Sequence, residues 1–206
     1  MKQIKIGLII LICLTVVNVV TWQFLDTKIG ELKTERGRII HSNWELLETG
    51  DIKDIFDYIQ ARNQKLSTRE LADYVSYVFQ LSDDYQNSKY PVTPWEIFEI
   101  SDIESDFRLN ARGASGEAGP MQIMPGTWKA IYKRFGFRPA DFENWYCNMA
   151  VATYHYSELK TICCGDSIEA IGRYNGGAKW RDKHISRNHV RKYQRVSRGI
   201  SKVRRI

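Results

Sequence analysis

The 206-residue sequence lacks both an internal repeat and a convincing run of alternating apolar and polar residues. A half-buried β-strand requires such alternation, so the chain is expected to be mainly helical. Charge is also missing from residues 6–25, and after residue 180 the only acid is Asp182. The length and the ordinary apolar content of 43% allow one domain with a real core and accessory segments.

The uncharged run over residues 6–25 reads "IGLIILICLTVVNVVTWQFL". Twenty residues at the helical rise span roughly 30 Å, which is the thickness of a bilayer core. The run does not end in the small-residue cleavage pattern of a signal peptide, and Trp22 stands where an interfacial aromatic is expected. We therefore expect an uncleaved transmembrane anchor, with residues 1–5 before it and a polar connector or stalk over residues 26–50.

The positive net charge of +6 comes from the C-terminal tail. Residues 181–206 hold ten Lys and Arg, whereas residues 1–180 hold 20 bases and 23 acids. Two interpretations stay open: the final helix of the domain with a solvated basic face, or a surface that attracts a protein partner, an anionic polymer or lipid. No nucleic-acid motif accompanies the charge, so nucleic acid is not expected as a partner.

Helical spacing and capping residues predict one mainly α domain over about residues 51–200. Capping-box patterns run from Ser67 to Glu70 and from Thr93 to Glu96, the second with Pro94 at the first helical position. The expected helices cover residues 51–63, 67–79, 93–107, 125–135, 144–164 and 167–174.

Glu104 stands near the end of an apolar helix and is followed by a glycine-punctuated loop. A carboxyl group among apolar side chains is harder to ionise, as a general acid near neutral pH requires. An exposed glutamate at a helix end is the plainer alternative. The loop glycines permit close backbone approaches, which would bring residues 121–124 beside the helix and form a site for a sugar or peptide.

Several blocks of sequence then follow one another in a recognisable order: "ESDF", "GPMQIMPGTW", "NMAVATYHYSEL", "AIGRYNGGAKW" and "HVRKY". Together they resemble the signature of family 1 (soluble-type, SLT-like) lytic transglycosylases, which are related to goose-type lysozymes. The resemblance covers about residues 90–195. It implies a lysozyme-like helical catalytic domain behind the transmembrane helix.

The resemblance also implies a role for seven residues. Glu104 would be the catalytic carboxyl group, and Tyr174 would position or support it. The sugar-binding residues would be Gln122, Met124, Asn175, Gly113 and Met121. No metal or other cofactor is implied, and the four histidines, His41, His155, His184 and His189, are scattered along the chain.

The chain departs from the family pattern at several positions. Gly113 stands where the family usually has a serine whose hydroxyl contacts the catalytic carboxyl group. Glu117 replaces a turn alanine, Pro120 a leucine and Ala152 a helix glycine. None of these changes removes the central glutamate, but Gly113 bears on the rate.

The activity that the resemblance implies is cleavage of the β-1,4 bond between N-acetylmuramic acid and N-acetylglucosamine in peptidoglycan. A single glutamate would first act as acid and then as base, with formation of 1,6-anhydro-N-acetylmuramic acid. Two alternatives stay open: a hydrolytic muramidase in which Asp106 or Glu117 activates water, and a non-catalytic peptidoglycan-binding or assembly module.

Peptidoglycan as substrate implies a topology that the charges flanking residues 6–25 do not decide. The domain would face the periplasm or wall from the inner membrane, with Lys2 and Lys5 in the cytoplasm. A bacterial and a phage-encoded origin both stay open. In an oxidising compartment Cys147 could pair with Cys163 or Cys164, and buried free thiols are the alternative.

Overall fold

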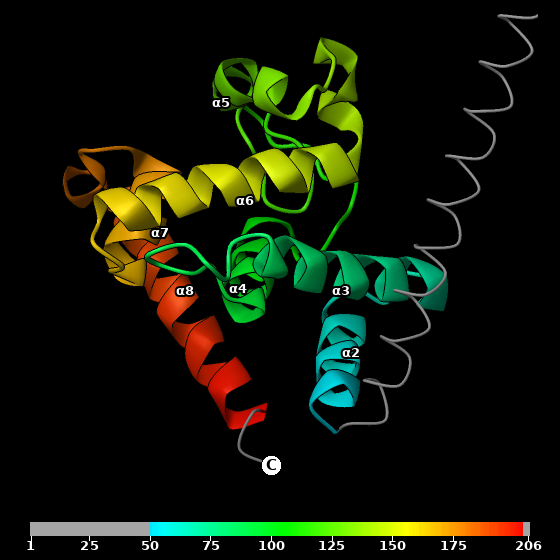
Figure 1. The fold of residues 1–206 in the computed structure, drawn as a ribbon. Coiled ribbons are helices and arrows are strands. Elements are labelled where there is room, and N and C mark those ends of the chain that lie inside the picture. Colours follow the sequence, from blue (N-terminus) through cyan, green and yellow to red (C-terminus); the bar gives the residue numbers. More distant parts are fainter. Residues whose placement is uncertain (1–49, 204–206) are drawn as a thin grey trace, which may run out of the picture. The chain divides into compact units, whose positions relative to one another are not determined.

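The structure, a computed structural model, describes residues 50–203 of the chain (Figure 1). Its elements are α2 (Gly50–Arg62), α3 (Thr68–Asp83), α4 (Pro94–Ser105), α5 (Pro125–Ile131), η1 (Tyr132–Phe135), η2 (Pro139–Glu143), α6 (Trp145–Ile162), α7 (Ser167–Gly176), η3 (Trp180–Asp182) and α8 (His184–Val203). The expectation of a mainly helical domain is confirmed.

Both predicted capping boxes are present. The Ser67 side chain accepts a hydrogen bond from the backbone N–H of Glu70, and the Glu70 carboxylate accepts one from the Ser67 N–H at 2.9 Å. Thr93 and Glu96 make the same reciprocal pair at the start of α4, where Pro94 is the first helical residue. The N-terminus of α4, and therefore the helical register that places Glu104, is fixed by these local contacts.

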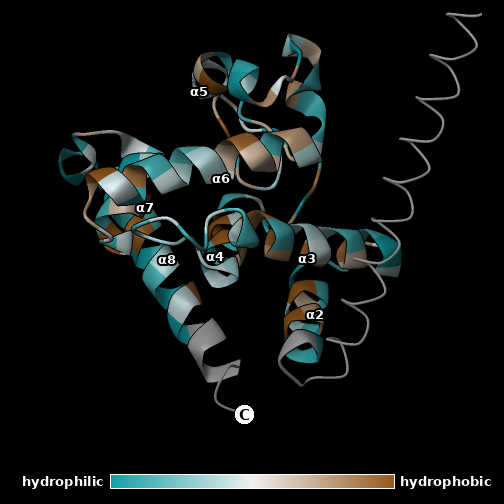
Figure 2. Cartoon of the chain, in the orientation of Figure 1, coloured by the Kyte–Doolittle hydropathy of each residue, from teal (hydrophilic) through white to brown (hydrophobic). Residues whose placement is uncertain are grey.

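Helix α4 is the centre of the domain. Its residues from Glu96 to Asp102 are all buried, so the helix is enclosed on every side and has no solvent-facing stripe. Helices α3 and α8 pack directly against it (Figure 1). Figure 2 shows the contrast with α8, which is coloured hydrophilic along most of its described length. Exposed bases on α8 are Arg187, Arg191, Lys192, Arg195 and Arg198.

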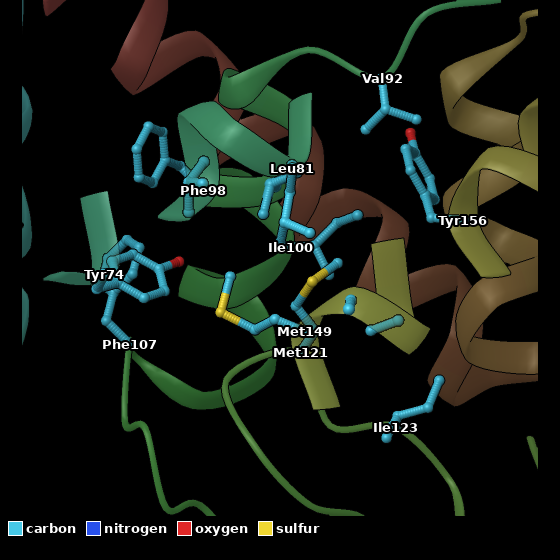
Figure 3. Packing of buried hydrophobic residues seen from close by; sticks show 14 of the residues in the cluster. Tyr74, Leu81, Val92, Phe98, Ile100, Phe107, Met121, Ile123, Met149 and Tyr156 are labelled. Carbon is cyan, nitrogen blue, oxygen red and sulfur yellow. The ribbon is translucent and has the colours of Figure 1, made fainter. Parts of the chain in front are cut away.

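A single apolar core joins α4 to the loop that follows it and to α6. Ile100 of α4, Met121 of the loop and Met149 of α6 are each fully buried, and Figure 3 shows their side chains converging. The loop therefore contributes to the core rather than lying over it, because its methionine fills space between two helices.

Three sequence expectations are modified or lie outside the described residues. The helix that begins at Pro125 ends at Ile131 and continues as the 3₁₀ helix η1 to Phe135. The predicted anchor at residues 6–25 and most of the connector lie outside residues 50–203, and within that range no helix is sufficiently long and apolar to cross a bilayer.

Of the two alternatives left open for Cys147, a disulfide and a free thiol, the structure shows the free thiol. Cys147, Cys163 and Cys164 are free thiols. Cys147 lies in the first turn of α6, and Cys163 is the residue that caps its other end. At the helical rise these positions are about 24 Å apart, whereas a disulfide needs Cα atoms within about 7 Å.

Candidate active site

Glu104 lies in the last turn of α4, and its side chain is 12% exposed. The helix ends at Ser105, and the two residues after it, Asp106 and Phe107, both adopt the left-handed backbone conformation, with φ of 51° and 59°. The turn is held because the Phe107 N–H donates to the carbonyl of Ser101 at 3.2 Å and Asn63 donates to the Phe107 carbonyl at 3.2 Å. Left-handed non-glycine residues are costly and cluster at functional sites.

Glu96, at the other end of α4, belongs to a buried polar network. Its carboxylate accepts hydrogen bonds from Lys160 at 2.8 and 3.0 Å, from Ser167 at 2.7 Å and from Tyr156 at 3.1 Å. Burial alone would raise the pKa of Glu96, but the bonds from Lys160 and Thr93 and the Lys160 charge together lower it below its ordinary value. This carboxylate is therefore structural.

Asp102 and Glu99 also have partners that account for their burial. Asp102 accepts hydrogen bonds from Tyr58 at 2.5 Å and from Nε of Arg62 at 2.7 Å. Glu99 interacts with Tyr193 of α8, whose pKa is raised by burial and by the nearby Glu99 charge. The other acids of α4 therefore have structural partners, and this distinguishes their role from that of Glu104.

The contact made by Glu104 is with an imidazole. Nε2 of His189 on α8 lies 2.9 Å from Oε1 of Glu104, and the His189 side chain is 10% exposed. The distance is that of a hydrogen bond, although the ring N–H is not aligned with the oxygen in this conformation. Catalytic hydrogen bonds in a protein without substrate are often misaligned in this way.

Tyr174 of α7 is hydrogen-bonded to the loop, and the Glu104 carboxyl group lies close enough to influence its hydroxyl. Its hydroxyl donates a 2.8 Å hydrogen bond to the carbonyl oxygen of Met121. Burial, with the Glu104 charge as a second cause, raises the pKa of Tyr174 well above its ordinary value. His155 of α6 packs against the same ring at a centroid distance of 5.6 Å, and burial lowers the pKa of His155.

The loop between α4 and α5 is folded by its own backbone. Gly113 donates from its N–H to the carbonyl of Glu117 at 2.9 Å, and Ala118 and Ile123 exchange two hydrogen bonds at 3.0 and 3.1 Å. Gly119 has a φ of +79°, and a Cβ there would overlap the Asn148 side chain of α6. A residue other than glycine would separate the loop from α6 at this point.

The expected sugar-binding residues differ in accessibility. Met124 is 43% exposed, Asn175 is exposed, and Gln122 is half-buried with φ of 49°. The Gln122 amide donates to the carbonyl of Gly119 at 2.8 Å. Met121 is fully buried, where its sulfur accepts from the Thr153 hydroxyl at 3.7 Å.

The two acids suggested as water-activating groups are both engaged in other contacts. Asp106 pairs with Arg62 of α2 at 2.9 Å. Glu117 folds over the loop and accepts a hydrogen bond from the Ser115 N–H at 2.9 Å. A Cβ added at Gly113 would lie 2.8 Å from the carboxyl carbon of Glu117, so the Glu117 carboxylate fills the space beside Gly113.

His189 is the site residue that sequence reasoning missed. In the sequence it is one of four scattered histidines, although it begins the block "HVRKY" that resembles the family's closing helix. That block places it where the family pattern has tyrosine. The block "HVRKY" is therefore a signal that could have identified His189. The four histidines are considered in the sequence only as metal ligands, and this does not relate any of them to the catalytic carboxyl group.

Comparisons with known proteins find similarity over the region that contains Glu104. The family model described as Transglycosylase SLT domain matches residues 84–196, more than half of the chain. A search of curated protein sequences returns no match.

The solved structures that are similar to this chain include two lytic transglycosylases. One is an inactive Glu-to-Gln mutant of lytic transglycosylase Slt from Pseudomonas aeruginosa, with a TM-score of 0.54 at 19% identity over 62% of this chain and 24% of that one. The other is the 70 kDa soluble lytic transglycosylase SLT70 from Escherichia coli, with a TM-score of 0.45 at 16% identity over 77% of this chain and 28% of that one. The matched region is about a quarter of each of these longer chains, and the first shows that the fold is shared.

Proposed function

Because this chain belongs to the Transglycosylase SLT domain family, we propose that it is a peptidoglycan lytic transglycosylase. The bond cleaved is the β-1,4 link between N-acetylmuramic acid and N-acetylglucosamine. The observation that supports this most directly is the position of Glu104 within the matched region: a nearly buried carboxyl group at the end of the central helix. The other buried acids of that helix are held by structural partners.

Glu104 first acts as a general acid. Its carboxyl group protonates the glycosidic oxygen, and the bond to C1 of the muramic acid breaks as positive charge develops on that sugar. The substrate's own N-acetyl group stabilises this charge. The carboxylate of Glu104 then removes the proton from the C6 hydroxyl, whose oxygen attacks C1 and closes the 1,6-anhydro ring. The proton count balances, and no water is consumed.

The surrounding residues divide between orientation and sugar contact. Tyr174 donates a 2.8 Å hydrogen bond to the Met121 carbonyl, which links the loop to α7. Gln122, Met124 and Asn175 provide accessible polar and apolar surface for sugar rings, and the backbone at Gly113 lies next to Gln122. The Met121 side chain is fully buried, so it supports the loop from within the core.

The test is mass spectrometry of purified peptidoglycan after digestion with the full-length chain, with Glu104→Gln beside it. Glutamine keeps the shape of the side chain but cannot donate or accept the catalytic proton. We expect anhydro-muropeptides from the wild-type chain and none from Glu104→Gln. The Slt structure described above is likewise an inactive mutant with glutamine in place of glutamate.

Two outcomes would replace the proposal. Products with a reducing end would make the protein a hydrolytic muramidase. The absence of products from folded protein that still binds peptidoglycan would make it a binding or assembly module. If hydrolysis is found, Glu117 is the acid to substitute next, because the carboxylate of Asp106 is already paired with Arg62.

We also propose a location for this activity. The uncharged run at residues 6–25 anchors the chain in the inner membrane, and the catalytic domain faces the periplasm or wall. Protease added to intact spheroplasts should then degrade the domain. Protection of the domain until the membrane is permeabilised would reverse the topology.

A further inference from the structure

The contact between His189 and Glu104 suggests a role beyond packing. We propose that His189 is the positioning residue for the catalytic carboxyl group: its Nε2–H donates to Oε1 of Glu104 and leaves Oε2 to exchange the proton with substrate. The proposal rests on the function proposed above. His189 thereby orients the Glu104 carboxyl group, which carries out both proton transfers.

The geometry provides the first argument. The two atoms are 2.9 Å apart, and both side chains are close to fully buried, at 10% and 12% exposed. Within the described part of the chain, Nε2 of His189 has no aligned hydrogen bond to any other group. A buried polar atom without a partner is costly, so a small rotation that aligns this pair is favourable.

The two stages of the reaction provide the second argument. When Glu104 is protonated on Oε2, its Oε1 is a carbonyl oxygen that accepts a hydrogen bond. After Oε2 has lost the proton, Oε1 is part of a carboxylate and still accepts. An Nε2–H donor therefore fits both stages without changing its own protonation. It also fixes which oxygen faces the substrate.

The elements that hold the pair provide the third argument. Glu104 is on the enclosed helix α4, and His189 is on α8, which packs directly against α4. Val190 and Tyr193 on the same helix are buried in the core. Because both partners are on packed helices and not on the loop, their separation is set before substrate binds, as a positioning contact requires.

The first experiment compares three substitutions of His189 in the full-length chain on soluble glycan strands of defined length. His189→Phe removes the donor, while His189→Gln and His189→Tyr supply a different one. We expect kcat to fall about 10- to 100-fold in His189→Phe with KM within about twofold, because misplacing a catalytic group by about 1 Å can cost on the order of 100-fold. The donor-bearing variants should recover most of the loss.

A matched control is available on the same helix. His184 is exposed and contacts Asn188 one turn along α8, so His184→Gln should leave kcat unchanged. Wild-type kcat in His189→Phe, or a His189→Gln variant no better than His189→Phe at equal melting temperature, would overturn the proposal. Glu104→Gln separates the two hypotheses: if it stays active, the proposed catalyst is wrong, and if it alone is inactive, only the role of His189 is wrong.

A second measurement does not depend on activity. Two-bond ¹H–¹⁵N NMR spectra report which ring nitrogen of each histidine carries the proton. We expect the Nε2–H form for His189 and a shift of its Nε2 resonance in Glu104→Gln, with the His184 resonances unmoved. A His189 ring that does not respond to Glu104→Gln would contradict the contact itself.

Discussion

The carboxylate of Glu117 occupies the space that a side chain at position 113 would need. A Cβ at Gly113 would come within 2.8 Å of the Glu117 carboxyl carbon and 2.9 Å of Oε1 of Gln122. Positions 113 and 117 both depart from the family pattern, which has serine at 113 and alanine at 117. The two departures are therefore coupled: glycine makes room for the glutamate, and a serine introduced alone at position 113 would meet the Glu117 carboxylate.

The coupling predicts a non-additive pair of substitutions. Gly113→Ser should destabilise the chain by about 1–3 kcal/mol, because the new side chain displaces Glu117 from its hydrogen bond with the Ser115 N–H. Gly113→Ser with Glu117→Ala should recover most of that loss. Urea unfolding of the two single variants, the double variant and the wild type measures the interaction. Purely additive effects would show that the two residues are independent.

The buried network around Glu96 predicts a large loss of stability. Glu96→Gln leaves the Lys160 ammonium buried without its charged partner, and breaking a buried pair in this way costs about 3–5 kcal/mol. The pKa of Glu96 is lowered in the folded chain, so its contribution is present at neutral pH and is lost as pH falls through that lowered value. Denaturant unfolding at pH 7 tests the first effect. A loss below about 1 kcal/mol would contradict it.

The stability of the folded chain should also depend on pH through His155, whose neutral form burial favours. Burial lowers its pKa, so below about pH 6.5 the unfolded chain binds a proton that the folded chain does not. Folding is therefore weakened as pH falls through this range and is unaffected above it. The melting temperature of wild type should fall more steeply from about pH 7.5 to about pH 5.5 than that of His155→Gln. His184→Gln, at an exposed histidine, should keep the wild-type slope.

Tyr174 predicts a change in activity with little change in stability. Tyr174→Phe removes the hydrogen bond to the Met121 carbonyl, which contributes about 1 kcal/mol to stability. The loop beside Glu104 then loses its link to α7, and we expect kcat to fall about tenfold. Because the pKa of Tyr174 is raised well above its ordinary value, the wild-type bond persists at alkaline pH. An active Tyr174→Phe variant would reduce this residue to packing.

Local chemistry decides those parts of the fold that can be predicted from the sequence. Thr93, Pro94 and Glu96 define the start of α4 by contacts within one turn, and the spacing of the apolar residues identifies the helices. Glu104 is identified through the motif that follows it. The structure adds the accessibility of the loop residues, including the complete burial of Met121.

Contacts between distant parts of the chain cannot be predicted in this way. The pairing of His189 with Glu104 depends on how α8 docks on α4, and the pairing of Asp106 with Arg62 depends on the position of α2. The relation of Glu117 to Gly113 is local, but it depends on the left-handed and bridged backbone of the loop rather than on residue type. These three contacts are set by helix packing or by loop conformation, which residue types alone do not indicate.

The enclosure of α4 has a consequence for how the protein tolerates mutation and heat. Glu104 is carried by the helix whose residues from Glu96 to Asp102 are all buried, so its position is determined by the same contacts that keep the domain folded. Thermal inactivation should therefore coincide with melting of the whole domain and should not precede it. Substitutions of the exposed bases on α8 should therefore leave the acid where the core places it.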